Sequence, residues 1–172
     1  MENCATGVSV EGVGAHFIQN VSVMSNSNSG VAITSNNNVV LDLFSSFNSG
    51  VGVRVLGDFN QVINAEISAN NSSGMEVSGS SNVISSSEYQ LNDDNGIVIS
   101  DADNNLIVGN SLDENGTNGI LLEADDQHGN VITGNEVNDS GNTDLRDQNN
   151  PACVNNVWIS NTFGSSNDSC IQ

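Results

Sequence analysis

The chain has 172 residues, of which 36% are hydrophobic and only 4% are aromatic. Two basic residues, Arg54 and Arg146, stand against 21 acidic ones, so the formal net charge is -19. Nucleic acids and anionic lipid surfaces are bound through basic tracks that displace their counterions, so both are excluded as partners. No apolar run approaches the roughly 20 residues of a membrane-spanning helix, which argues against membrane insertion.

Short units that begin with glycine recur along the whole chain. Each reads glycine, apolar residue, any residue, apolar residue, and successive units start 20 to 24 residues apart. Self-similarity at such a period indicates stacked structural units that bury their apolar faces only against one another. The units begin at Gly7, Gly30, Gly50, Gly74, Gly96 and Gly119, and Thr143-Asp144-Leu145 stands where a seventh is expected.

A second unit recurs in the later part of the chain, at residues 105–112, 130–137 and 156–163. It reads asparagine, two apolar residues, any residue, glycine or serine, asparagine, any residue, and a last apolar residue. Short apolar groups with Asn, Ser, Asp and Gly between them are typical of strands joined by turns. The repeat is too short for a helical crossover or for a helix-pair repeat. We therefore predict an all-β parallel solenoid of about seven coils, with three short strands per coil.

In chain order, the pattern predicts a single domain over residues 1–172. We expect this domain to be a fragment of a longer chain, because repeat stacks need capping units and no such unit precedes the first repeat. The predicted coils are residues 1–29, 30–49, 50–73, 74–95, 96–118 and 119–142, and residues 143–172 form a closing coil at the carboxyl end.

The abundant asparagines have a structural interpretation. Glycine and asparagine tolerate the left-handed backbone that repeated corners require. Stacked asparagine amides also hydrogen-bond to one another, as in cross-β ladders. Aliphatic residues such as Ile97, Ile99, Ile120 and Leu122 are then expected to form continuous inward columns.

These repeats resemble the right-handed parallel β-helix repeat family, the pectin-lyase-like superfamily that includes NosD-like proteins. The similarity covers residues 7–163. It implies the same fold, in proteins that range from polysaccharide lyases, hydrolases and epimerases to phage tailspikes and plain surface proteins. The fold alone does not choose among these activities.

Cysteines suggest how the carboxyl end is closed. Cys153 and Cys170 are 17 residues apart, a little less than one coil, so we hypothesise a disulfide between them. A disulfide indicates an oxidising compartment, hence an extracellular, cell-surface or periplasmic location. Cys4 is left over, and its pairing stays open.

One group of candidate catalytic residues lies on the glycine-led strands. The resemblance implies that a polysaccharide would lie along an outward sheet face, where Arg54 and Glu76 are the adjacent opposite charges. A lyase would use Arg54 as the base, with Asp58 and Glu76 nearby. The alternative is an exposed ion pair that contributes less than about 1 kcal/mol.

Acidic corners provide a candidate metal site. Asp101 and Asp103 follow one glycine-led unit, and Asp125 and Asp126 follow the next, so neighbouring coils are expected to bring four carboxylates together. Like charges at this spacing repel unless a cation neutralises them. Calcium suits such an oxygen-rich cage, and the alternative is a set of solvated, fanned-out carboxylates.

Three functional classes remain. The first is a noncatalytic extracellular or surface repeat domain that binds a polysaccharide or a cell-surface protein along an outward sheet face, and the sequence favours it. The second is a polysaccharide-modifying lyase, epimerase or hydrolase, which the scarcity of Lys, Arg, His and Tyr argues against. The third is a structural spacer. Self-association through the ends of the solenoid is a further open interpretation.

Overall fold

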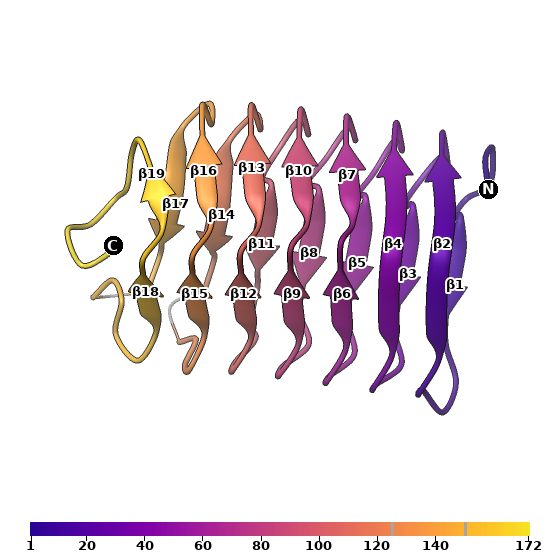
Figure 1. Cartoon of the computed structure of the whole chain (residues 1–172), viewed down its shortest axis with the longest axis horizontal. Coiled ribbons are helices and arrows are strands. Elements are labelled where there is room, and N and C mark those ends of the chain that lie inside the picture. The colour runs from indigo at the N-terminus through magenta and orange to yellow at the C-terminus, as the bar shows by residue number, and fades with distance from the viewer. Residues whose placement is uncertain (125, 150) are drawn as a thin grey trace.

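The computed structural model describes residues 1–124, 126–149 and 151–172. The backbone winds into coils that stack from the amino end to the carboxyl end of an elongated molecule (Figure 1). Every strand pair is parallel, and the strands form one seven-stranded and one twelve-stranded sheet. The predicted all-β parallel solenoid of about seven coils is therefore confirmed.

Each coil contributes one strand to the seven-stranded sheet, the rear sheet in Figure 1. These strands are β1 (Val8–Val10), β3 (Val31–Ile33), β5 (Val53–Val55), β8 (Met75–Val77), β11 (Ile97–Ile99), β14 (Asn118–Leu122) and β17 (Thr143–Asp147).

The twelve-stranded front sheet is bent into two halves. In the first two coils one long strand crosses both halves: β2 (Phe17–Met24) and β4 (Val39–Ser46). From the third coil on, two strands replace it, which gives the predicted three strands per coil. The first half holds β6 (Gln61–Ile63), β9 (Val83–Ser85), β12 (Leu106–Val108), β15 (Val131–Thr133) and β18 (Val157–Ile159). The second half holds β7 (Glu66–Ser68), β10 (Glu88–Gln90), β13 (Ser111–Asp113), β16 (Glu136–Asn138) and β19 (Thr162–Phe163).

The register follows the sequence repeats, with one correction. Ile97 lies beside Ile120, so Gly96 and Gly119 are on neighbouring coils as expected. The third glycine-led unit, however, begins at Gly52 and not at Gly50, because Val53 pairs with both Val31 and Met75.

Close backbone approach explains the choice of glycine at this position. A Cβ atom added to Gly52 would lie 2.7 Å from the carbonyl oxygen of Gly74, and one added to Gly74 would lie 2.7 Å from that of Gly96. The last strand has Asp144 at this position instead of glycine. The Asp144 side chain points to the closing segment, where it accepts from Gly164 and Ser165. Glycine is therefore required wherever another coil follows.

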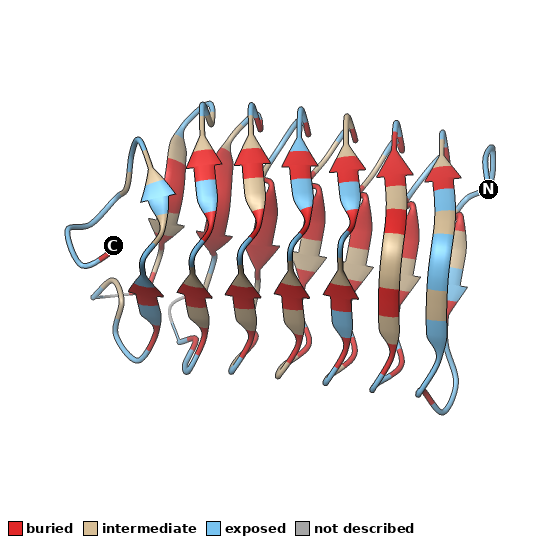
Figure 2. Cartoon of the chain, viewed as in Figure 1, coloured by how far each residue is buried: buried red, intermediate tan, exposed pale blue. Residues whose placement is uncertain are grey.

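Alternating side chains fill a narrow core between the two sheets. Figure 2 shows buried residues alternating with intermediate or exposed ones along the front strands. Tyr89 lies between Ile67 and Leu112, and Trp158 continues the column of Ile107 and Ile132. The inward aliphatic columns predicted from the sequence are confirmed: Ile97, Ile99, Ile120 and Leu122 have no exposed surface.

Asparagine ladders run through the corners. Most ladder asparagines donate from Nδ2 to the Oδ1 of the asparagine one coil further along, for example over 2.9 Å from Asn70 to Asn92. The same Oδ1 accepts the backbone N–H of the preceding ladder residue, so it satisfies two buried donors. At Asn60 and Asn82 the backbone N–H alone donates to the next Oδ1, and the buried Nδ2 has no partner among the described residues. The ladders comprise Asn26, Asn48, Asn70, Asn92 and Asn115; Asn38, Asn60, Asn82, Asn105, Asn130 and Asn156; and Asn110, Asn135 and Asn161.

Two buried carboxylates organise the carboxyl end. Asp144 accepts hydrogen bonds from the backbone N–H groups of Ser140, Gly164 and Ser165. Asp147 accepts from Asn149, from the Cys153 backbone N–H at 3.0 Å, and from Trp158 Nε1 at 3.0 Å. The predicted Cys153–Cys170 disulfide is confirmed, and Cys4 is an exposed free thiol.

Removing one ladder amide should destabilise the fold. In an Asn92→Ala variant, the buried N–H groups of Asn70 lose their acceptor and the Ile67 carbonyl loses a donor. Each unsatisfied buried group costs about 1–3 kcal/mol, so we expect the free energy of unfolding to fall by roughly 2–5 kcal/mol in urea titrations. Asn71→Ala, an exposed neighbour, is the control and should change it by less than about 0.5 kcal/mol. Equal effects would contradict the ladder's role.

Opening the disulfide should loosen the closing segment selectively. We expect a Cys153→Ser, Cys170→Ser double variant to exchange amide hydrogens faster over residues 151–172, because closing a loop of this size stabilises by about 3 kcal/mol on the entropic model. The middle coils should keep their protection. Cys4→Ser is the matched control and should leave the exchange pattern unchanged, whereas equal exchange in both variants would show that the disulfide does not hold this segment.

Candidate functional site

The outward face of the seven-stranded sheet carries one residue from the middle of each strand. We call this column the arginine row, because it contains both basic residues of the chain. Its members, in order along the solenoid, are Ser9, Ala32, Arg54, Glu76, Val98, Leu121 and Arg146.

Arg54 and Glu76 are adjacent on this face, as predicted, and the start of the third unit at Gly52 places them in one row instead of two neighbouring ones. Their contacts measure 2.9 Å from Nε and 2.8 Å from a terminal guanidinium nitrogen to the same carboxylate oxygen, Oε2. The side chains are 39% and 30% exposed, so the pair contributes at most about 1 kcal/mol to stability. An arginine guanidinium in proteins keeps its proton, which makes Arg54 a poor base. Its catalytic role stays a prediction.

Arg146 differs from Arg54 in its surroundings. No carboxylate of the described residues lies within ion-pairing distance of its guanidinium. Between the two arginines, Val98 and Leu121 are only 5% exposed although they lie outside the core cluster. Little of either side chain is therefore accessible to solvent. The row therefore offers one guanidinium engaged by Glu76 and one that is available.

Asp58 lies at the corner after β5, not on the sheet face. Its carboxylate accepts the backbone N–H of Ser80, one coil further along, at 2.7 Å. The same arrangement recurs at each coil of this corner: Asn36 accepts from Asp58, Ser80 from Asp103, and Asp103 from His128. The Asp58 carboxylate therefore has a structural hydrogen bond, and the catalytic role predicted for it stays untested.

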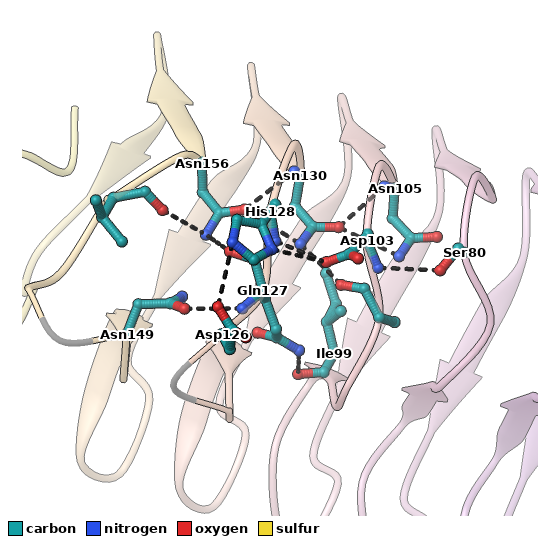
Figure 3. Close-up of polar contacts among 12 residues, drawn as sticks. Ser80, Ile99, Asp103, Asn105, Asp126, Gln127, His128, Asn130, Asn149 and Asn156 are labelled. Atoms are coloured by element: carbon teal, nitrogen blue, oxygen red, sulfur yellow. Dashed lines mark hydrogen bonds and ion pairs between the residues drawn. The ribbon is translucent and has the colours of Figure 1, made fainter.

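The acidic corner brings two of the predicted metal ligands to a histidine. His128 Nε2 lies 3.2 Å from an oxygen of Asp126, and its Nδ1 lies 3.7 Å from Asp103 (Figure 3). Asp101 is exposed, and Asp125 lies outside the described residues. Within the part of the chain that the structure describes, no three His, Cys, Asp or Glu side chains are placed to hold a metal ion. The calcium site stays a prediction.

A groove that the sequence analysis missed runs along the bend of the front sheet. The bend residues of successive coils have left-handed backbones, among them Asp42, Asn64 and Ser86. Beside them a shallow groove of about 300 Å³ is lined by Phe44, Glu66 and Glu88. Hydrogen bonds from Asn64 at 2.6 Å and from Gln19 at 3.2 Å lower the pKa of Asp42. The signal in the sequence was the regular spacing of these polar residues between two apolar strands.

Tyr89 is removed from any surface chemistry. It is fully buried, and its hydroxyl lies 3.7 Å from the sulfur of Met75. Burial raises the pKa of the Tyr89 hydroxyl, far outweighing the opposing hydrogen bond with Ser87. Because this is the only tyrosine, the chain has no phenol that could move a proton at the arginine row.

The protein is a β-solenoid of the β-helix class. Its coils pair through parallel in-register strands, and asparagine ladders join their corners. The chain belongs to the right-handed β-helix family, because the sequence model of the family described as "Right handed beta helix region" matches residues 6–168. A search of the curated proteins found no match.

Solved structures of similar fold include two epimerases and a lyase, named for alginate, mannuronan and pectate. The periplasmic alginate epimerase AlgG superposes with a TM-score of 0.77 at 16% identity, over 95% of this chain and 44% of that protein. The A-module of the mannuronan C-5 epimerase AlgE6 from Azotobacter vinelandii gives 0.74 at 13% identity, over 95% and 54%. Pectate lyase Pel9A gives 0.55 at 14% identity, over 89% and 55%. The chain thus spans about half the length of these proteins or less, and the similarity shows the fold.

The burial of Tyr89 makes a pH prediction with a definite sign. Since its folded-state pKa is raised above the unfolded value of about 10, the unfolded chain releases this proton first. Stability from this group is therefore fully present below about pH 10 and falls as the pH rises further. Near-ultraviolet titration should show no phenolate in the folded protein near pH 10, and Tyr89→Phe should remove the alkaline slope of the unfolding free energy. Normal titration in the native protein would contradict the burial.

Proposed function

We propose that this chain is a noncatalytic polysaccharide-binding domain that holds an extended glycan along the arginine row. The observation that carries the proposal is the placement of both basic side chains, Arg54 and Arg146, in one outward row of a chain with a net charge of -19. A flat, regular face with one side chain per coil suits a linear polymer, whose repeats follow the solenoid axis.

The chemistry of the row favours a glycan with carboxylates. An available guanidinium binds a carboxylate through two parallel hydrogen bonds, which are stronger than neutral ones. The similar fold of an alginate epimerase, a mannuronan C-5 epimerase and a pectate lyase supports the same class of ligand.

The site geometry supports binding over catalysis. Epimerisation or elimination needs a group that takes a proton from the sugar, and histidine, carboxylate, lysine or tyrosine usually serves. In the described residues the arginine row contains one carboxylate, Glu76, and this is held by Arg54 at 2.8 Å. His128 lies at the acidic corner, and Tyr89 is buried. The polysaccharide-modifying alternative rests on the similar folds alone.

The negative surface sets a condition on this binding. A polyuronate is repelled by a surface of the same charge, so the interaction should strengthen when a divalent cation bridges carboxylates of the two partners. The disulfide supports an extracellular, surface or periplasmic setting, where both such polymers and calcium are accessible.

Substitution of the available arginine should weaken glycan binding. We expect Arg146→Gln to reduce the affinity for alginate or pectate by about tenfold or more, since a charge-assisted hydrogen-bonded contact contributes about 1.5–3 kcal/mol and each 1.4 kcal/mol is about tenfold. Calorimetric titration with and without calcium measures this change. The matched control, Ser68→Asp, alters the net charge by the same unit on the outward face of the opposite sheet, and its affinity should stay within about twofold of wild type.

Two results would overturn the proposal. Equal losses of affinity in the two variants would show that net charge, and not the arginine row, governs binding. Release of unsaturated or epimerised uronates by the wild-type chain would show that the domain is catalytic.

A further inference from the structure

The first half of the front sheet turns an apolar surface outward. Inward side chains of its strands, such as Ile84 and Ile107, fill the core, yet the residues on either side of them are mostly aliphatic as well. We call this surface the apolar face. It consists of two outward rows: Phe17, Val39, Gln61, Val83, Leu106, Val131 and Val157; and Gln19, Leu41, Ile63, Ser85, Val108, Thr133 and Ile159.

Among the described residues, no strand of the other sheet packs on this face. The contacts of its strands are with the neighbouring strands of the same sheet. Phe17 at one end is 65% exposed, and Val157 and Ile159 at the other end are 47% and 48% exposed. Between these ends the outward side chains are partly exposed, as a flat sheet surface requires (Figure 2). A contiguous apolar surface of this kind marks an interaction site.

The charge distribution indicates what this site accepts. The apolar face contains no ionisable side chain, in a chain that carries 21 carboxylates. The second half of the same sheet, across the bend, presents Glu66, Glu88, Asp113 and Glu136 outward. Two copies of a chain with a net charge of -19 repel each other at almost every surface. The apolar face is where two copies approach without bringing carboxylates together.

We propose that the apolar face is the interface of a reversible, two-fold symmetric dimer of this chain. A second copy presents by construction a surface of the same length, strand spacing and neutral character, as an isologous interface requires. A basic protein partner would instead favour the acidic half of the sheet. In such a dimer the arginine rows, on the opposite sheet, remain accessible in both copies (Figure 1).

The size of the face predicts the strength of the dimer. Seven strands at ~4.8 Å spacing give a length of about 30 Å, and two outward positions with their side chains give a width of about 15 Å. This is on the order of 450 Å² per copy, below the ~800 Å² per partner of stable interfaces. We therefore expect dissociation in the micromolar range or weaker. Because burial drives the contact and charge opposes it, added salt should strengthen the dimer by screening.

Sedimentation equilibrium on the whole chain in a Cys4→Ser background, which prevents intermolecular disulfides, tests the proposal. We expect a monomer–dimer equilibrium whose association constant rises between about 0.02 and 0.5 M salt. Leu106→Lys, in the centre of the face, should weaken association more than tenfold. Ser111→Lys is the matched control: it adds the same charge, outward, in the same coil, but on the acidic half, and it should leave association unchanged or slightly stronger. Thermal unfolding and Leu106→Gln, a neutral change, check that lost association does not reflect lost folding.

The outcomes separate this interface from its alternatives. A chain that stays monomeric at several hundred micromolar and high salt overturns the proposal. So does a dimer that survives a well-folded Leu106→Lys variant, since association would then use another surface, such as the exposed edge of β2 at the amino end. Selective loss of the dimer in Leu106→Lys and Leu106→Gln, with Ser111→Lys intact, supports it.

Discussion

The hydrogen bond from one asparagine amide to the next is the constraint on which this structure depends. Its length, for example 2.9 Å between Asn48 and Asn70, requires each corner to return directly above its counterpart. The same Oδ1 atoms accept the corner backbone N–H groups, which would otherwise be buried without partners. A loop that changes length must therefore still return its asparagine to the ladder. The step from Asn82 to Asn105 spans 23 residues, and the step from Asn105 to Asn130 spans 25.

Fixed corners turn a one-dimensional repeat into surfaces of uniform chemistry. Once the ladders hold the coils in register, every strand position becomes a row along the solenoid axis. A residue type that recurs at the same position of each repeat then forms an aliphatic column inside the solenoid or a row of similar side chains on its outside. The arginine row is one such row, and the apolar face consists of two more on the opposite sheet. The acidic half of that sheet arises in the same way. The surface to which a residue contributes is therefore set by its position within the repeat, and not by its neighbours in the sequence.

This logic explains which features the sequence could predict. Glycine and asparagine mark the same positions in successive repeats, so aligning them predicts which residues are neighbours. Examples are Ile97 beside Ile120 and Ile107 beside Ile132. At the third coil, Gly50 and Gly52 both fit the glycine-led pattern, and only the packing against Gly74 selects Gly52. The disulfide was predictable because its cysteines are 17 residues apart, a little less than one coil.

The candidate sites were harder to predict, for physical reasons. His128 and not an aspartate lies opposite Asp103, because more residues connect β14 to β15 than connect β11 to β12. The apolar face was hidden because strands such as Leu106–Val108 are apolar at every position, so alternation does not reveal which side chains point outward. The adjacency of Arg54 and Glu76 was predictable, because both were expected on the outward face of neighbouring coils, but their common row, hydrogen bonding and partial exposure required coordinates.

The carboxyl end shows how the same principle terminates a column. Val77, Ile99 and Leu122 stack in one inward row, and the next position is Asp147. A buried carboxylate needs several donors, and here it receives them from Asn149, Cys153 and Trp158 of the closing segment. An aliphatic coil stacked on it would leave that charge unpaired, which is strongly destabilising. Asp147 therefore ends the aliphatic column and, with the disulfide, holds the segment that covers it.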